Sequence, residues 1–136
     1  MIDLAGLRER LASTSPRTRN IAAIELMDAG DSRAVPLLVE AIERPENRNA
    51  RGTLIYALSD FDCSELCSQL VRWATEGGYE ATGEALCIIR NQGLRPSASE
   101  VAACKAAVSA VRLGEPTEEQ LELAAELDEL LFGPAR

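Results

Sequence analysis

Apolar residues recur along this chain at the three- and four-residue spacing of amphipathic helices, and one such helical pattern returns 32 positions later. Arg19 matches Arg51, and Leu26 matches Leu58. The other matched pairs are Ala22 and Leu54, Ala23 and Ile55, Asp28 and Asp60, Ala34 and Leu66, and Leu38 and Leu70. A fainter third copy follows after a further 31 positions. A period of this length indicates stacked helical units, each too small to bury its apolar face alone.

Helical spacing, bounded by capping and helix-breaking residues, predicts eight helices and no strand. Ser15 is a predicted N-cap with Pro16 in the first turn, Gly30 ends that helix, and Thr117 with Gln120 has the spacing of a capping box. The predicted helices cover 2–12, 16–29, 32–44, 47–59, 64–75, 79–90, 97 or 99 to 113, and 117–131. The predicted fold class is therefore all-α.

The 136 residues predict a single domain built from about three helical hairpins. Ala and Leu supply most of the apolar residues and only 4% of the chain is aromatic, which favours closely packed helices. The predicted division is an N-terminal capping helix at 1–14, repeats at 16–45, 46–77 and 78–113, and an acidic C-terminal capping helix at 116–132.

Two motifs of the first copy resemble HEAT-like repeats, especially the short bacterial kind found in phycobilisome lyase subunits. They are Arg19-x-x-Ala22-Ala23-x-x-Leu26 and Asp31-x-x-Ala34-Val35-Pro36-x-Leu38. The second copy keeps Arg51, Leu58, Leu66 and Leu70 but has Leu66-Cys67-Ser68 in place of the Ala-Val-Pro segment. The resemblance covers about residues 16–92 and implies a right-handed α-α superhelix, a HEAT-like solenoid that acts as a protein-binding scaffold.

The net charge of −8 is unevenly placed along the chain. Residues 1–55 hold eight arginines against eight Asp and Glu, so the whole acidic excess lies in residues 56–136. This balance disfavours nucleic acid and anionic membranes as partners, because phosphates require a basic surface. It is compatible with a basic protein partner, while the alternative is that the charge serves solubility alone.

The predicted location is the cytoplasm. The charged N-terminus lacks the apolar centre of a signal peptide, and no apolar run has the roughly 20 residues of a transmembrane helix. The four cysteines are expected to stay reduced.

The resemblance implies that the second helix of each pair lines the concave face, where HEAT-like scaffolds bind their ligands. The residues predicted to face solvent there are Arg33, Leu37, Glu40 and Arg44 in the first copy and Glu65, Gln69, Arg72 and Glu76 in the second. Spacings of four, three and four put each set on one side of its helix. Together they predict a mixed-charge ladder with an exposed Leu37. Two interpretations stand: a protein-binding groove, or a solvated face with ion pairs inside the stack.

Two aromatic residues and one acidic segment are further candidates for partner binding. Trp73 and Tyr79 are possible anchors, although the helical spacing of Trp73 after Leu66 and Leu70 also suits the edge of the core. The run from Glu115 to Glu129 has seven carboxylates and no basic residue. It is interpreted as the polar outer face of a terminal repeat, or alternatively as a docking surface for a basic partner.

The residue types needed for metal binding or catalysis are poorly represented. Cys63 and Cys67 are four apart, but without a histidine a zinc site is not expected, and Cys67, Cys87 and Cys104 are predicted core residues. The sequence has no phosphate-binding glycine loop and no recognisable nucleophile. No metal and no cofactor are therefore predicted.

The sequence as a whole predicts a non-catalytic adaptor that binds another protein on its concave face. An inhibitor or immunity protein that occludes a basic toxin is one form of this class. A chaperone or lyase-type subunit acting on a chromophore-binding protein is the alternative, suggested by the resemblance alone. A nucleic-acid enzyme is a third class, which would need a basic concave face and aromatic residues to hold an extruded base.

Overall fold

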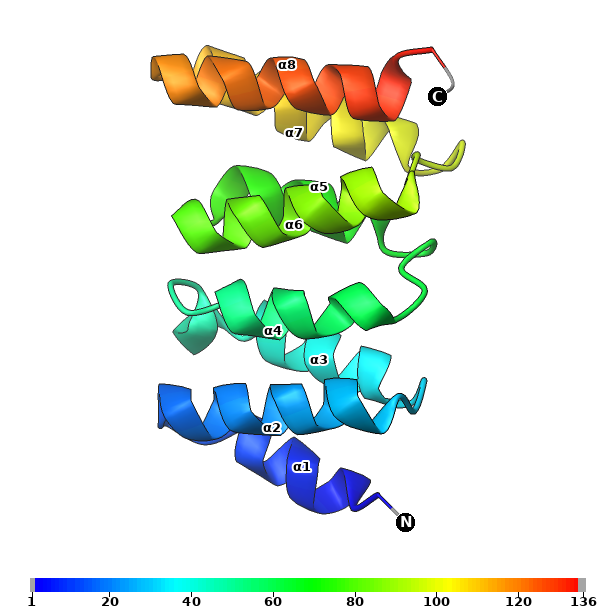
Figure 1. Cartoon of the computed structure of the whole chain (residues 1–136). Coiled ribbons are helices and arrows are strands. Elements are labelled where there is room, and N and C mark those ends of the chain that lie inside the picture. Colours follow the sequence, from blue (N-terminus) through cyan, green and yellow to red (C-terminus); the bar gives the residue numbers. More distant parts are fainter. Residues whose placement is uncertain (1, 135–136) are drawn as a thin grey trace.

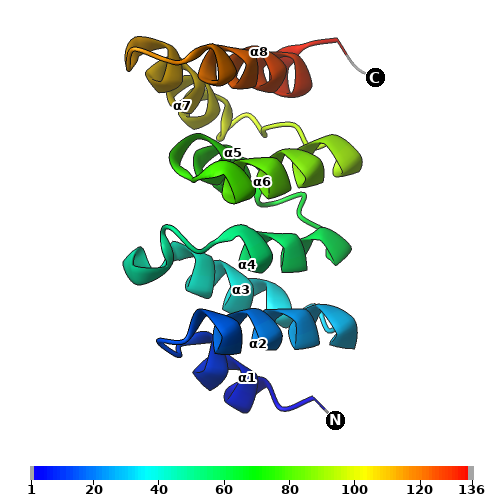
Figure 2. The ribbon, with the colours of Figure 1, turned by 60° about the vertical axis from the view of Figure 1, so that its left-hand side comes forward.

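The computed structural model describes residues 2–134 and shows eight α-helices stacked in two layers (Figure 1). One layer contains α2 (Pro16–Ala29), α4 (Gly52–Ala57), α6 (Tyr79–Gln92) and α8 (Glu118–Phe132). The other contains α1 (Leu4–Leu11), α3 (Ala34–Glu43), α5 (Cys67–Glu76) and α7 (Val101–Leu113) (Figure 2). Short 3-10 helices cover Pro45–Asn47 and Leu58–Asp60. Residues 2–134 contain no strand, which confirms the predicted all-α solenoid.

Neighbouring helices pack both along and across the layers. Within the layers, α2 packs on α4, α4 on α6, α1 on α3 and α5 on α7. Across the layers, α1 packs on α2, α3 on α4, α5 on α6 and α7 on α8. Each helix thus buries its apolar stripe against its immediate neighbours, as expected of a repeat stack.

The core is continuous along the stack, and residues matched by the 32-position shift occupy equivalent places in it. Leu26 and Leu58 are fully buried, as are Leu38 and Leu70. Trp73 also has no exposed surface. The repeat in the sequence is therefore a repeat of buried positions, which explains why apolar identity is kept there more strictly than elsewhere.

The matched arginines of the repeat are buried structural residues. Arg19 donates from Nη1 to the carbonyl oxygen of Ser13 at 2.8 Å, and Arg51 donates from Nε to that of Ile42 at 2.8 Å. Both side chains are more than nine-tenths buried. In each case the guanidinium satisfies a carbonyl of the preceding segment and so ties one helical unit to the one before it.

Local capping chemistry explains the helix ends that the sequence predicts correctly. Ser15 Oγ accepts a hydrogen bond from the amide of Thr18, and Gly30 ends α2 in the left-handed conformation with φ of 66°. At α8, Thr117 and Gln120 form both reciprocal hydrogen bonds of a capping box. These contacts satisfy backbone groups that a helix end leaves unpaired.

Helices α4, α5 and α7 begin later than predicted, because side chains hold the preceding residues in turns. α4 begins at Gly52 instead of residue 47, since Asn47 donates from Nδ2 to the carbonyl of Ala41 at 2.8 Å. α5 begins at residue 67 instead of 64, after a turn in which Asp62 accepts from the amide of Ser64. α7 begins at residue 101, after a turn in which Glu100 accepts from the amide of Ser97.

Candidate functional site

The predicted partner-binding face lies along α3, the turn before α5 and α5 itself. Most of its charges are paired within the molecule. Glu40 accepts two hydrogen bonds from Arg8, at 3.0 and 3.2 Å, and one from Arg44 at 3.4 Å. Arg33 lies at the start of α3 and pairs with Asp31 at 2.6 Å. The Arg33 guanidinium lowers the pKa of Asp31 from its usual 3.8 to about 2. These contacts pair the charges of the face with other residues of the stack.

The α5 part of this face is organised around Glu43. Arg72 donates to the two Glu43 carboxylate oxygens at 2.6 and 3.0 Å, and Trp73 donates from Nε1 to the same carboxylate at 3.0 Å. The Arg72 guanidinium, followed by the indole donor, holds the pKa of Glu43 below its usual value against the opposing effect of desolvation. Glu76 lies 3.8 Å from Nη1 of the buried Arg51. This arrangement has the ion pairs of a solvated face, and its partner-binding role stays a prediction.

Four residues of the prediction differ in their placement. Leu37 is half-buried and packs against the core, so the prediction that this leucine is exposed is wrong. Glu65 is exposed but lies in the turn before α5, and Gln69 is half-buried beside Ser68, whose hydroxyl donates to it. Trp73 has no exposed surface and is therefore not available as a partner anchor. Helical spacing alone did not show how far the adjacent helices cover each side chain.

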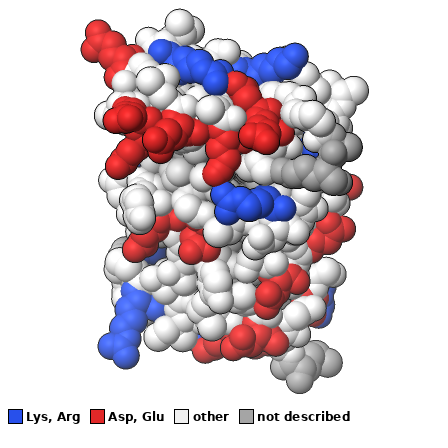
Figure 3. Space-filling view, turned by 45° about the horizontal axis from the view of Figure 1, so that its top comes forward, with Lys and Arg blue, Asp and Glu red and all other residues white. Residues whose placement is uncertain are grey.

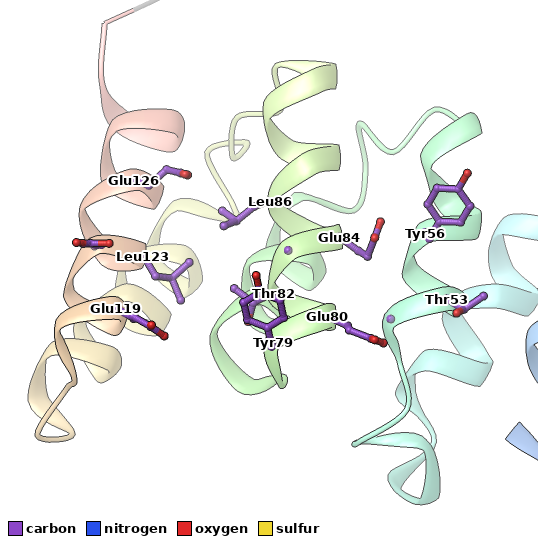
Figure 4. A pocket seen from close by; sticks show the side chains of 13 residues that line it. Thr53, Tyr56, Tyr79, Glu80, Thr82, Glu84, Leu86, Glu119, Leu123 and Glu126 are labelled. Atoms are coloured by element: carbon purple, nitrogen blue, oxygen red, sulfur yellow. The ribbon is translucent and has the colours of Figure 1, made fainter.

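A groove that the sequence did not predict crosses the other layer, over α4, α6 and α8 (Figure 4). Its volume is about 850 Å³. It is lined by Gly52, Thr53 and Tyr56 of α4, by Tyr79, Glu80, Thr82, Gly83, Glu84 and Leu86 of α6, and by Glu119, Glu122, Leu123 and Glu126 of α8. We call this surface the acidic groove.

Differences in helix packing create the acidic groove. α4 and α6 approach closely where Gly52 faces Glu80, since a Cβ added at Gly52 would lie 2.8 Å from the Glu80 Cβ. By contrast, α6 packs mainly on α5 and α8 mainly on α7, so the space between α6 and α8 is filled less completely. Leu86 and Leu123 point toward one another across this space and are half-buried (Figure 4). They give the groove an apolar floor.

Five glutamates line the acidic groove, and four of them have no ion pair within residues 2–134. Glu126 accepts from Arg90 at 2.8 and 2.9 Å, whereas Glu80, Glu84, Glu119 and Glu122 have no basic neighbour within ion-pair distance. The lining contains no Lys or Arg. Figure 3 shows acidic side chains gathered across the upper part of the molecule. The groove therefore presents uncompensated negative charge to solvent.

Two tyrosines border the acidic groove. Tyr79 is 93% exposed at the start of α6, which fits the projection expected for an anchor, although its anchoring role stays a prediction. Tyr56 of α4 is 44% exposed. An exposed aromatic ring beside carboxylates can bind a cation through its face while a carboxylate neutralises the charge.

Part of the acidic groove can be recognised from the sequence alone. Glu80 and Glu84 are four apart in a helix and have no basic residue three or four positions away, and the glutamates of α8 repeat at spacings of three and four. The acidic segment Glu115–Glu129 was one predicted docking surface. Its placement opposite Glu80 and Glu84 depends on the stacking of α8 beside α6, which no local pattern specifies.

Two of the buried thiols stay protonated near neutral pH. Burial raises the pKa of Cys63 to about 11 and that of Cys67 to about 12, so neither is a thiolate near neutral pH. Cys104 is buried, but Cys87 is exposed on α6, so its predicted place in the core is wrong. Residues 2–134 contain no group of three or more His, Cys, Asp or Glu side chains positioned to bind a metal ion. None of the helices in this range combines the length and apolar character needed to cross a membrane.

Comparison with known proteins agrees with the architecture. A family profile described as HEAT repeats matches residues 4–86, which is more than half of the chain. Neither the search of curated proteins nor the search of solved structures gave a match. The matched segment runs from α1 into α6 and includes both strongly related copies.

Proposed function

The chain belongs to the HEAT repeat family, whose repeats generally mediate protein–protein interaction, and from this premise we propose that it is a non-catalytic scaffold that binds a basic partner protein in the acidic groove. The observation that carries the proposal is the set of four unpaired glutamates around an apolar floor. Unpaired carboxylates attract a basic surface at long range, and the apolar floor supplies area that is stabilised by burial.

The acidic groove is a better candidate than the α3–α5 face because its charges are available. A partner that bound Glu40 or Glu43 would compete with Arg8 or Arg72, which already neutralise these carboxylates. In the groove, Glu80 and Glu122 have no such competitor within residues 2–134. The exposed Tyr79 adds an aromatic group of the kind that contributes strongly to protein interfaces.

Charge-reversal variants on the two surfaces distinguish them. We expect tagged wild-type protein to retain a basic protein from host lysate, and the Glu80→Lys, Glu84→Lys variant to lose it. The Arg44→Glu, Arg72→Glu variant, on the predicted face, should still retain it. Thermal unfolding of each variant checks that it folds. Loss of the same partner in the second variant, with retention in the first, would place the interface on α3 and α5 instead.

Inhibition of a basic toxin is the form of this function that a charge-complementary groove suits best. The captured partner would then be an enzyme whose activity falls on titration with wild-type protein. The Glu80→Lys, Glu84→Lys variant should leave that activity unchanged. Capture without any effect on the partner's activity would favour an adaptor over an inhibitor.

A further inference from the structure

Gly83 is a helix-interior glycine for which the folded chain itself supplies no reason. It lies inside α6, in its second turn, and a Cβ added there would meet no atom within 4 Å. Its φ is not positive, unlike that of Gly93 at the end of the same helix. Glycine inside a helix lowers stability relative to alanine. Neither backbone conformation nor packing within the chain therefore accounts for this residue.

Gly83 lines the acidic groove, on the α6 stripe that also carries Tyr79 and Leu86. Residues four and seven positions apart share one side of a helix. Leu86 and the facing Leu123 form the apolar floor beside it. The missing side chain thus widens the groove on the stripe that carries Leu86, in the manner of glycines that allow close approach of another molecule to a backbone.

Carboxylates flank this apolar centre on two sides. Glu80 and Glu84 lie on the side of α6 that faces α4, and Glu80 points toward that helix in Figure 4. Glu119, Glu122 and Glu126 lie on α8, across the floor. An occupant that spans the groove therefore contacts the glutamates of α6, then the apolar floor, and then the glutamates of α8.

We propose that the acidic groove binds a segment of the partner protein in which an apolar side chain, flanked on both sides by Lys or Arg, sits over Gly83 between Leu86 and Leu123. This inference rests on the proposed function and specifies the occupant. The flanking basic residues pair with the glutamates of α6 and α8, and an arginine at one end stacks on the Tyr79 ring. A groove of about 850 Å³ is in the roughly 300–1,000 Å³ range of ligand pockets, which suits a short segment better than a single side chain.

The test uses two labelled synthetic peptides, each with two arginines on either side of a central residue that is leucine in one and serine in the other. Fluorescence anisotropy with the wild-type protein should show binding of the leucine peptide, with the serine peptide weaker by about tenfold. Gly83→Leu should fill the space and weaken the leucine peptide by about tenfold or more, while the exposed Ser109→Leu on α7 should not. Gly83→Ala, which favours the helix, should weaken it less than Gly83→Leu.

Charge variants separate this inference from the proposed function. Glu80→Lys, Glu84→Lys should abolish binding of both peptides, whereas Glu9→Lys, Glu46→Lys makes the same change in net charge at exposed positions elsewhere and should not. Equal binding of the two peptides, unaffected by Gly83→Leu but lost on groove charge reversal, would overturn the inference and leave the proposed function intact. Binding that both double variants keep or both lose would overturn both. Self-association of the wild type, removed by Gly83→Leu in sedimentation, would make a second copy the occupant and overturn the inference.

Discussion

Two surfaces of the stack, the predicted partner-binding face along α3 and α5 and the acidic groove, use their charged residues in opposite ways. Along α3 and α5, Glu40 and Glu43 are each held by an arginine from another part of the chain. Over α4, α6 and α8, Glu80, Glu84 and their counterparts on α8 face solvent with little compensation. Charged residues in a repeat protein can thus either join adjacent units or remain available for another molecule. The geometry of their neighbours, more than their number, decides between the two.

The largest expected effect separates the two aromatic residues first considered as anchors. Trp73→Ala removes a fully buried side chain and should lower the free energy of unfolding by about 3–5 kcal/mol. Tyr79→Ala removes an exposed ring and should change it by no more than about 0.5 kcal/mol. Chemical denaturation of both variants measures the difference. Similar values for the two would contradict the assignment of Trp73 to the core.

A smaller effect is expected where a carboxylate is paired. Glu43→Ala leaves the Trp73 indole N–H and the Arg72 guanidinium without their acceptor, which should cost about 1–3 kcal/mol. Glu84→Ala in the acidic groove removes no hydrogen bond that the described residues make, so a change within about 0.5 kcal/mol is expected. Urea denaturation of this matched pair tests whether the charges of the α3–α5 face and of the acidic groove differ in their structural role. Equal losses of stability in Glu43→Ala and Glu84→Ala would contradict a structural role that is specific to the paired carboxylate.

Acidification should weaken the ion pairs of the α3–α5 face. The pKa values of Glu40 and Glu43 are lowered in the folded protein, from 4.5, by their arginine partners, so their stabilising contribution is complete above pH 4.5. This stabilising contribution is lost as pH falls through the lowered pKa values of the folded protein. The contribution of Asp31, whose pKa in the folded protein is about 2, is lost only as pH approaches that value. The stability gap between wild type and Glu43→Ala should therefore narrow below about pH 4. A gap that does not narrow as pH falls below 4.5 would show that ion pairing does not cause it.

The smallest expected effect concerns two glycines with opposite surroundings. Gly83→Ala should stabilise the protein by about 0.5–1 kcal/mol, because the helix gains and nothing obstructs the new methyl group. Gly52→Ala should destabilise it, because the new Cβ would lie 2.8 Å from the Glu80 Cβ and separate α4 from α6. Thermal unfolding midpoints report both signs. A destabilising Gly83→Ala would indicate a contact of Gly83 within the stack that its surroundings do not show.

The sequence predicts well what nearest neighbours along the chain determine. The caps at Ser15 and Thr117 depend on contacts three residues away, and the turn at Gly30 depends on one backbone conformation. The repeat of Leu26 and Leu58 reports burial because periodic apolar positions face the adjacent helix. These features follow from local chemistry and spacing.

Prediction was less successful where side chains from distant segments meet. The sequence predicts a helix that begins at Asn47, yet the Asn47 side-chain amide donates to the carbonyl oxygen of Ala41 and α4 begins only at Gly52. Cys87 was placed in the core because it is a small residue, yet it lies on the exposed side of α6. The acidic groove needs Glu80 and Glu122 to lie on adjacent helices of one layer, α6 and α8, which depends on how α8 docks. No periodicity in either helix contains that information.

The position of α8 at the end of the stack ties the acidic groove to local unfolding. In a linear array each unit is held only by its neighbours, so a terminal hairpin opens at lower free energy than the middle. Detachment of α7 and α8 would remove Leu123 and three of the lining glutamates while the rest of the stack stayed folded. A partner in the groove would fasten this end to α4 and α6, and amide hydrogen exchange in α8 should slow more than exchange in α2. Binding would then raise the free energy needed to open the last hairpin toward that of the central helices.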